Sequence, residues 1–306
     1  DLGRYDDDPD EREGRPRGGR EPVAAAYATD HGGGSDRDMT MAIGVGIGLV
    51  GAFLLTMAVG TKFTVALVAV VLALAAGEYF AALRKVGWEA APLLGIAACA
   101  LFPLAVYWRG IGAFGLLGFL LLAALLCWFL FGAGGSEPRL LEGSGATLLG
   151  VTWIGGLGAT AAAMLRTSDG RGWLIIAVLG AVAYDIGGLF LGRAFGHRPL
   201  SSASPNKTLE GLVAGMGCSA VVVLVAVGMF DLGPWDGAGA ALALGVGAAV
   251  AAPLGDLCQS MLKRDLGIKD MGSLLPGHGG VFDRFDSLLF VLPALFWLTA
   301  LVGRVG

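Results

Sequence analysis

The chain has 306 residues and a net charge of −4, and 55% of its residues are hydrophobic while only 15% are charged. Soluble domains carry about 25% charged residues, so this composition excludes an ordinary soluble domain and indicates a polytopic membrane protein. Its four cysteines stand singly in apolar stretches, which argues against a zinc site or a disulfide framework. We expect no nucleic acid among its partners.

Residues 1–38 differ from the rest of the chain. They are rich in Asp, Glu, Arg, Gly and Pro and have almost no apolar periodicity, which is typical of a disordered tail. The first long apolar run begins only near Met39, so a secretory signal is not expected. We therefore divide the chain into a charged tail (1–38), N-terminal transmembrane helices (39–170) and a C-terminal catalytic transmembrane region (171–306).

From Met39 onward, the sequence contains about nine apolar runs, each long enough to cross a bilayer core of about 30 Å as a helix. The predicted fold is an all-α polytopic membrane protein with two polar loops on the cytosolic side. The runs are centred near Val50, Val70, Ala98, Leu120, Gly155, Gly180, Val222, Ala248 and Leu292.

Lys and Arg residues set the expected orientation, because cytoplasmic loops carry an excess of them. If the N-terminus is cytoplasmic, most basic residues of the connecting loops fall on the cytoplasmic side. Both long polar loops, 192–209 and 259–284, then face the cytoplasm. Whatever these loops bind is therefore a cytosolic compound.

Two carboxylates stand within or at the end of apolar runs. Asp185 lies inside the sixth run, and Asp256 lies at the end of the eighth. A carboxylate at this depth costs about 2.5–3.5 kcal/mol on insertion scales, so it needs a cation or a hydrogen-bond donor. One interpretation is an ion pair within the bundle, for instance between Asp185 and Arg193. The other is metal ligation or substrate contact.

Further polar residues follow at helical spacing. Ser260 comes four residues after Asp256, on the same face if the helix continues, and Lys263 and Arg264 follow one turn later. Asp283 and Asp286 are three residues apart at the start of the last span. Their alternative role is N-capping of that helix, and both capping and ligation remain open.

The other polar loop opens the seventh span. Ser204-Pro205 is expected to start a turn, and Lys207 and Thr208 precede a helix start whose N–H groups favour anions. Glu210, in the first turn, has the plain alternative of compensating the helix dipole.

This set of residues suits a polyphosphate site. Carboxylates together with a hydroxyl are hard oxygen ligands, which fit Mg²⁺ better than zinc or copper. The turn His278-Gly279-Gly280 offers backbone N–H groups to phosphate. The cations that suit phosphate as charge-assisted donors are Lys207, Lys263, Arg264, Lys269 and Arg284.

The polar run before the last span also has a specific order, Ser260-x-Leu262-Lys263-Arg264-x4-Lys269-Asp270-x-Gly272-x2-Leu275-Pro276-x-His278-Gly279-Gly280-x-x-Asp283-Arg284-x-Asp286. Upstream stand Asp185, Gly192-Arg193 and Ser204-Pro205-x-Lys207-Thr208-x-Glu210-Gly211. Over residues 175–305 this pattern resembles the signature of the bacterial phosphatidate cytidylyltransferases, also called CDP-diacylglycerol synthases. The N-terminal half contributes only its hydrophobic spans. Leu189 is a departure, because relatives usually carry an aromatic residue there, and it puts a packing or base-stacking contact in doubt.

The resemblance implies the reaction of CTP with phosphatidate to give CDP-diacylglycerol and pyrophosphate, a step of phospholipid biosynthesis. The attacking phosphate monoester is already anionic at neutral pH, so in-line attack on the α-phosphorus of CTP needs no strong general base. Metal ions and cationic side chains lower the barrier by reducing charge repulsion and by positioning the substrates.

The hypothesis assigns Mg²⁺ to Asp256 and Asp283, with Asp185 or Asp286 as a further ligand. The resemblance also implies a second cation, K⁺, a homodimer, and a place in the bacterial cell membrane. The distribution of Lys and Arg puts the active site on the cytoplasmic side. The candidate catalytic residues are Asp256, Asp283, Lys263, Arg264 and His278. The candidate substrate-binding residues are Ser204, Lys207, Thr208, Glu210, Ser260, Lys269 and Arg284.

Two other functions fit part of the pattern. A CTP-dependent transferase could act on a different lipid phosphate, such as an isoprenoid ether phosphate or a polyprenol. An ion-coupled transporter could use the intramembrane carboxylates as a relay, which Asp185 alone would permit. A transporter, however, needs no cluster of phosphate-binding cations on one membrane face.

Overall fold

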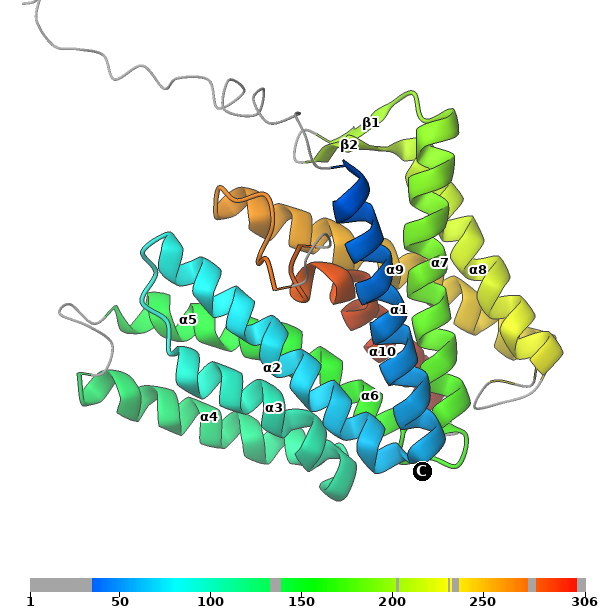
Figure 1. The fold of residues 1–306 in the computed structure, drawn as a ribbon. Coiled ribbons are helices and arrows are strands. Elements are labelled where there is room, and N and C mark those ends of the chain that lie inside the picture. Colours follow the sequence, from blue (N-terminus) through cyan, green and yellow to red (C-terminus); the bar gives the residue numbers. More distant parts are fainter. Residues whose placement is uncertain are drawn as a thin grey trace, which may run out of the picture.

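The computed structural model describes residues 35–132, 139–201, 204–230, 232, 237–274 and 279–301. These residues form helices joined by short loops, together with a single hairpin (Figure 1). The elements are α1 (Ser35–Val59), α2 (Thr61–Lys85), α3 (Pro92–Arg109), α4 (Ala113–Leu130), α5 (Leu140–Gly150), the π-helical turn η3 (Val151–Leu157), α6 (Gly158–Met164), α7 (Gly170–Phe195), β1 (Pro199–Ser201), β2 (Ser204–Thr208), α8 (Leu209–Phe230), α9 (Ala238–Asp265) and α10 (Phe282–Leu301).

The prediction of an all-α polytopic membrane protein is confirmed. Eight helical segments among the described residues are long and apolar enough to cross a membrane, one of which is the continuous stretch Leu140–Met164 formed by α5, η3 and α6. Helix α1 contributes a shorter apolar stretch, Gly44–Val59. The expected nine runs thus correspond to eight full-length spans and this shorter one. Large apolar side chains such as Leu116 and Phe119 on α4 point outward, as a lipid-facing surface requires.

The helices form two groups that share one hydrophobic core. Helices α2 to α6 pack against one another, and α7, α8 and α9 form a second group (Figure 1). Helix α10 lies between them, because it contacts α2, η3 and α6 on one side and α7 and α9 on the other. The division expected near residue 170 falls at the turn where α6 ends and α7 begins.

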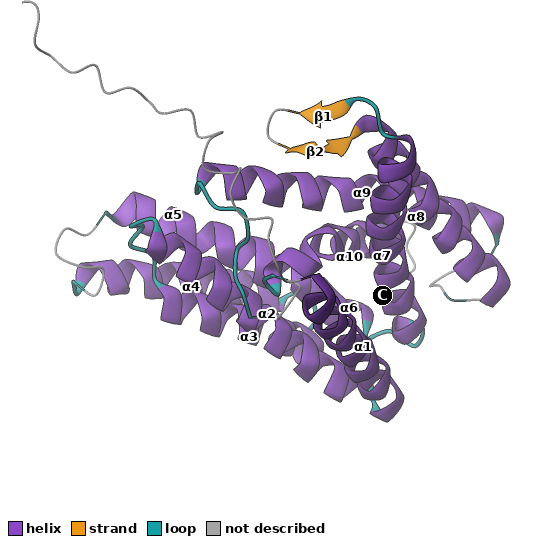
Figure 2. Ribbon diagram, turned by 45° about the horizontal axis from the view of Figure 1, so that its top comes forward, coloured by secondary structure: helices purple, strands orange, loops and turns teal. Residues whose placement is uncertain are grey.

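The two polar loops are shorter than expected because the flanking helices continue into them. Helix α7 extends to Phe195, and α9 extends to Asp265. Between α7 and α8 the chain forms the antiparallel hairpin β1–β2, with Pro199 opposite Thr208. The hairpin projects beyond the end of α7 (Figure 2). The expected turn at Ser204-Pro205 is wrong, since both residues begin β2; each strand of a two-stranded hairpin is an edge strand, where proline is tolerated.

Small residues allow the helices that carry the polar residues to approach closely. A Cβ atom at Gly211 on α8 would lie 2.9 Å from the carbonyl oxygen of Gly188 on α7. A Cβ atom at Gly255 on α9 would overlap the backbone carbonyl of Asp286 on α10. Close backbone contact of this kind is the usual way to pack helices in lipid. Asp256 directly follows Gly255 on α9, so this close contact lies next to both Asp256 and Asp286.

Candidate active site

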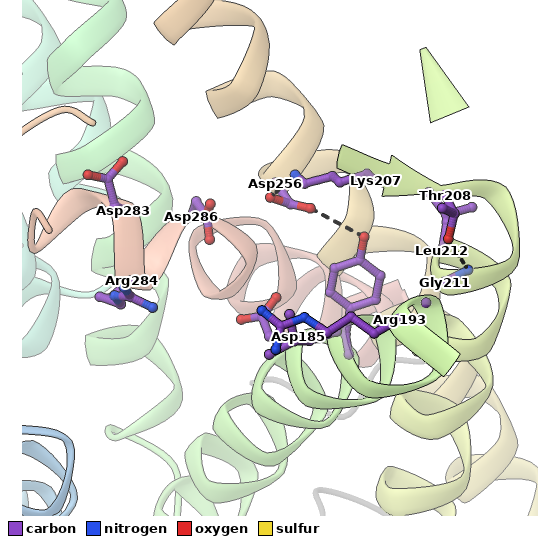
Figure 3. Close-up of a pocket in the computed structure, with 14 residues that line it drawn as sticks. Asp185, Arg193, Lys207, Thr208, Gly211, Leu212, Asp256, Asp283, Arg284 and Asp286 are labelled. Atoms are coloured by element: carbon purple, nitrogen blue, oxygen red, sulfur yellow. Dashed lines mark hydrogen bonds and ion pairs between the residues drawn. The ribbon is translucent and has the colours of Figure 1, made fainter. Parts of the chain in front are cut away.

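A cavity of about 730 Å³ lies where α7, β2, α8, α9 and α10 meet. Figure 3 shows its polar side chains converging from these elements. All four carboxylates proposed as metal ligands line it, although they come from three different helices. The polar and charged residues of the lining are Tyr184, Asp185, Arg193, Lys207, Thr208, Asp256, Asp283, Arg284 and Asp286.

Asp256 and Lys207 form an ion pair at one side of the cavity. The Lys207 ammonium also donates a hydrogen bond to the Ser260 hydroxyl at 3.0 Å, and the Tyr184 hydroxyl donates to Asp256 at 3.4 Å. Because α9 continues through this region, Asp256 and Ser260 share one helical face, as the spacing predicted. The lysine of the hairpin therefore bridges Asp256 and Ser260, which lie one helical turn apart on α9.

Asp283 is held by three donors. The Lys263 ammonium lies 3.1 Å from its Oδ1, and the backbone N–H groups of Met271 and Gly280 donate to its Oδ2 at 3.0 and 3.1 Å. Its side chain is only 8% exposed. Charge-assisted hydrogen bonds of this kind offset the cost of burying a carboxylate. Asp283 thus organises the loop before α10 while also facing the cavity.

Asp185 and Asp286 are linked through Ser287. The Ser287 hydroxyl donates to Asp185 at 3.1 Å, and the Ser287 N–H donates to Asp286 at 2.7 Å. Within the described residues, Asp185 forms no ion pair with Arg193, the partner that was named as an example for an ion pair within the bundle. In the view of Figure 3, Asp286 lies between Asp256 and Asp283.

The donor set of the cavity fits a divalent cation. Four carboxylates facing one space are the hard oxygen ligands that Mg²⁺ prefers. The ammonium groups of Lys207 and Lys263 lie beside Asp256 and Asp283, where positive charge is favoured. Among the described residues, no three acidic, His or Cys side chains are close enough together to hold an ion. Ion binding at Asp256 and Asp283 therefore requires carboxylates of the lining to move closer together and each lysine to leave its carboxylate.

The other predicted site residues lie around the cavity or outside it. Thr208 lines the cavity, and its hydroxyl accepts the N–H of Gly211 at 3.1 Å. Arg264 and Lys269 are exposed and do not belong to the lining. Glu210 accepts hydrogen bonds from the N–H groups of His197 and Arg198 at 3.1 and 3.2 Å, so it ties the end of α7 to the start of α8.

Two predicted site residues lie partly or wholly outside the part of the chain that the structure describes. His278 is not among the described residues. For Ser204 only the backbone is described, as the first residue of β2.

Sequence reasoning missed two of the lining residues as site candidates. Tyr184 directly precedes Asp185, and Arg193 lies about two turns after it on the same helix. Arg193 entered the sequence analysis as a possible ion-pair partner and as part of the family pattern, but without a role in the site. The signal that could have found it is its spacing, because residues two turns apart on a helix face the same way.

Comparison with known proteins identifies similar chains. A family model described as "Cytidylyltransferase family" matches residues 40–302. The chain is 32% identical over 267 residues to a phosphatidate cytidylyltransferase of Mycobacterium bovis, a match that covers 83% of this chain and 85% of that protein. It is 32% identical over 287 residues to the chloroplastic phosphatidate cytidylyltransferase 5 of Arabidopsis thaliana, over 82% of this chain and 68% of that protein. A phosphatidate cytidylyltransferase of Staphylococcus haemolyticus is 41% identical over 131 residues, which cover 42% of this chain and 49% of that protein.

Proposed function

Because this chain belongs to the cytidylyltransferase family, we propose that it is a phosphatidate cytidylyltransferase, which converts CTP and phosphatidate to CDP-diacylglycerol and pyrophosphate. The observation that carries the proposal is the cavity in which four carboxylates from three helices face the cations of α7, β2 and α10. Such a mixture of anionic and cationic groups is suited to a metal-bound polyphosphate.

The reaction needs positioning and charge compensation rather than a base. A phosphatidate oxygen attacks the α-phosphorus of CTP, a new P–O bond forms, and the bond to the β-phosphate oxygen breaks in line as pyrophosphate leaves. Arg193, Lys207 and Arg284 line the cavity and are suited to neutralise the triphosphate and the lipid phosphate. Their charges reduce the repulsion between the two anionic substrates.

Asp256 and Asp283 would hold Mg²⁺, with Asp185 or Asp286 as a further ligand. Bound Mg²⁺ supplies electrophilic stabilisation of charge on the triphosphate. Lys207 and Lys263, released from their carboxylates, would be free to contact phosphate oxygens. The resemblance to the family adds K⁺ and a homodimer to the proposal.

We further place the protein in the bacterial cell membrane with the cavity facing the cytoplasm. The excess of Lys and Arg on that side supports this orientation. The orientation also suits the substrates, since CTP is soluble in the cytosol and phosphatidate lies in the bilayer.

The test is to incubate the purified full chain in phosphatidate-containing vesicles with CTP and Mg²⁺. We expect CDP-diacylglycerol and pyrophosphate in equal amounts, and loss of both when a chelator removes the metal. A panel of isoprenoid ether and polyprenol phosphates distinguishes the alternative substrates. Turnover only with another lipid phosphate, or no CTP consumption at all, would overturn the proposal.

A further inference from the structure

A buried carboxylate of the N-terminal group of helices reaches the loop before α10. Glu78 lies on α2 and is only 4% exposed. Its carboxylate accepts a hydrogen bond from the N–H of Phe282 at 3.0 Å and another from the N–H of Leu274 at 3.4 Å. These partners are 204 and 196 residues away in sequence. One side chain of the first group thus holds both sides of a loop that belongs to the second.

Glu78 and Asp283 both lie against Gly280, on the side where a side chain would project. A Cβ atom at Gly280 would lie 2.6 Å from an oxygen of Glu78 and 2.9 Å from an oxygen of Asp283. Gly272 also packs directly against the Glu78 carboxylate, with no room for a side chain. Asp283 in turn accepts the N–H groups of Met271 and Gly280. The described ends of the loop are therefore held by two neighbouring carboxylates, of which only Asp283 belongs to the cavity lining.

Phe282 connects Glu78 to α10, because its N–H donates to the Glu78 carboxylate. It is the first residue of that helix, and its carbonyl accepts a hydrogen bond from the Gln259 amide at 2.8 Å. Its ring packs edge-to-face against Tyr79 and Trp153, with ring centroids 6.3 and 5.8 Å apart. Glu78 therefore caps α10 from another helix, where a carboxylate complements the positive end of the helix dipole. The first turns of α10 carry three residues of the cavity lining: Asp283, Arg284 and Asp286.

We propose that Glu78 is a positioning residue for the cytidylyl transfer. By fixing the N–H groups of Leu274 and Phe282, it sets the start of α10 and hence the positions of Asp283, Arg284 and Asp286 in the cavity. The catalytic part of this inference rests on the proposed function. The structural part, that Glu78 holds the loop, does not.

The test compares Glu78→Gln with Thr147→Val. Glutamine keeps the size of the side chain but replaces one acceptor oxygen with an NH₂ group, so one of the two loop N–H groups loses its partner. Thr147 is a suitable control, because it is also buried, its hydroxyl accepts the N–H of Ala91 at 3.0 Å, and neither residue lines the cavity. Glu78→Gln removes one hydrogen bond to the loop, whereas Thr147→Val removes two, because the Thr147 hydroxyl also donates to the carbonyl of Gly143 at 2.7 Å.

We expect both variants to lower Tm, Thr147→Val at least as much as Glu78→Gln, and only Glu78→Gln to lower kcat, by about 10- to 100-fold per folded molecule, because small misplacements of catalytic groups are costly. Hydrogen exchange of peptides containing Leu274 or Phe282 should accelerate in Glu78→Gln and stay unchanged in Thr147→Val. Unchanged kcat in Glu78→Gln, or equal loss of kcat in both variants, would overturn the positioning role. If the unaltered protein forms no CDP-diacylglycerol, the proposed function fails, while the exchange measurement still decides whether Glu78 holds the loop.

Discussion

At the scale of single residues, the most informative side chains are charged groups that pair across different elements. Lys207 of β2 pairs with Asp256 of α9, and Lys263 of α9 pairs with Asp283 of α10. In each case a carboxylate that is costly to bury is compensated by a cation from another part of the chain. The same groups are the ones that a metal-bound triphosphate would use.

Asp256→Asn should nearly abolish activity. The change removes a proposed metal ligand and the partner of Lys207, so we expect turnover to fall by more than about 100-fold. The control is Glu142→Gln, which breaks the exposed ion pair with Arg139 outside the cavity and should leave turnover unchanged. Steady-state CDP-diacylglycerol formation is the measurement, and near-normal turnover of Asp256→Asn would refute the assignment.

Thr208 should contribute to stability as the N-cap of α8. Its hydroxyl accepts the N–H of Gly211, so Thr208→Val should cost about 1 kcal/mol of stability. Thr208→Ser keeps the hydroxyl and should stay close to the unaltered protein. Thermal unfolding in detergent measures both, and equal Tm values for the two variants would argue against capping.

Much of the polar lining could be predicted from the sequence, whereas the partners and role of Glu78 could not. Asp185 and Asp256 were noticed because carboxylates are rare in apolar runs, and Lys207 because it stands at a helix start. Glu78 also lies in an apolar run, but its partners are backbone N–H groups far away in sequence, which leave no side-chain pattern. Only the three-dimensional structure brings it to the loop.

At the scale of elements, the helices follow from hydrophobic length, while the hairpin does not. All nine predicted run centres fall within helices. The strands β1 and β2 are short, polar and irregular in register. No alternation of apolar residues in the sequence therefore predicts them. The polar stretch that holds Lys207 is placed by backbone pairing instead.

The contact between α9 and α10 should tolerate no side chain at Gly255. Gly255→Ala would push α9 away from the carbonyl of Asp286, and overpacking of this kind costs about 1–3 kcal/mol. Because it also separates Asp256 from Asp286, activity should fall together with Tm. The control is Gly217→Ala on α8, where an added Cβ meets nothing within 4 Å and both properties should hold. Full activity of Gly255→Ala would show that this spacing is unimportant.

At the scale of the whole molecule, the distribution of charge predicts which membrane face carries the cavity. His197, next to the hairpin, and Ile111, between α3 and α4, are on opposite faces in the proposed orientation. In a background without native cysteines, a membrane-impermeant thiol reagent added outside intact cells should label Ile111→Cys and spare His197→Cys. Inverted vesicles should show the reverse. Labelling of His197→Cys from outside would reverse the orientation.

The relation between the two helix groups was the least predictable feature at this scale. The signature residues all lie in the C-terminal part, so the N-terminal group was expected to supply only membrane spans. The structure instead packs α10 against both groups. Residue patterns along a chain report which faces are apolar, but they do not report which distant helix covers them.

The hydrogen bond between Glu78 and Phe282 limits how such a protein can be recombined. The signature residues all lie in the C-terminal region, which suggests that this region could be transferred as a unit. The start of α10 is nevertheless held by the side chain of Glu78 on α2. A chimera that joins the N-terminal helices of one relative to the C-terminal region of another keeps every signature residue. It can still lose the alignment of α10 unless the carboxylate of α2 and the small residues at 272 and 280 are inherited as a set.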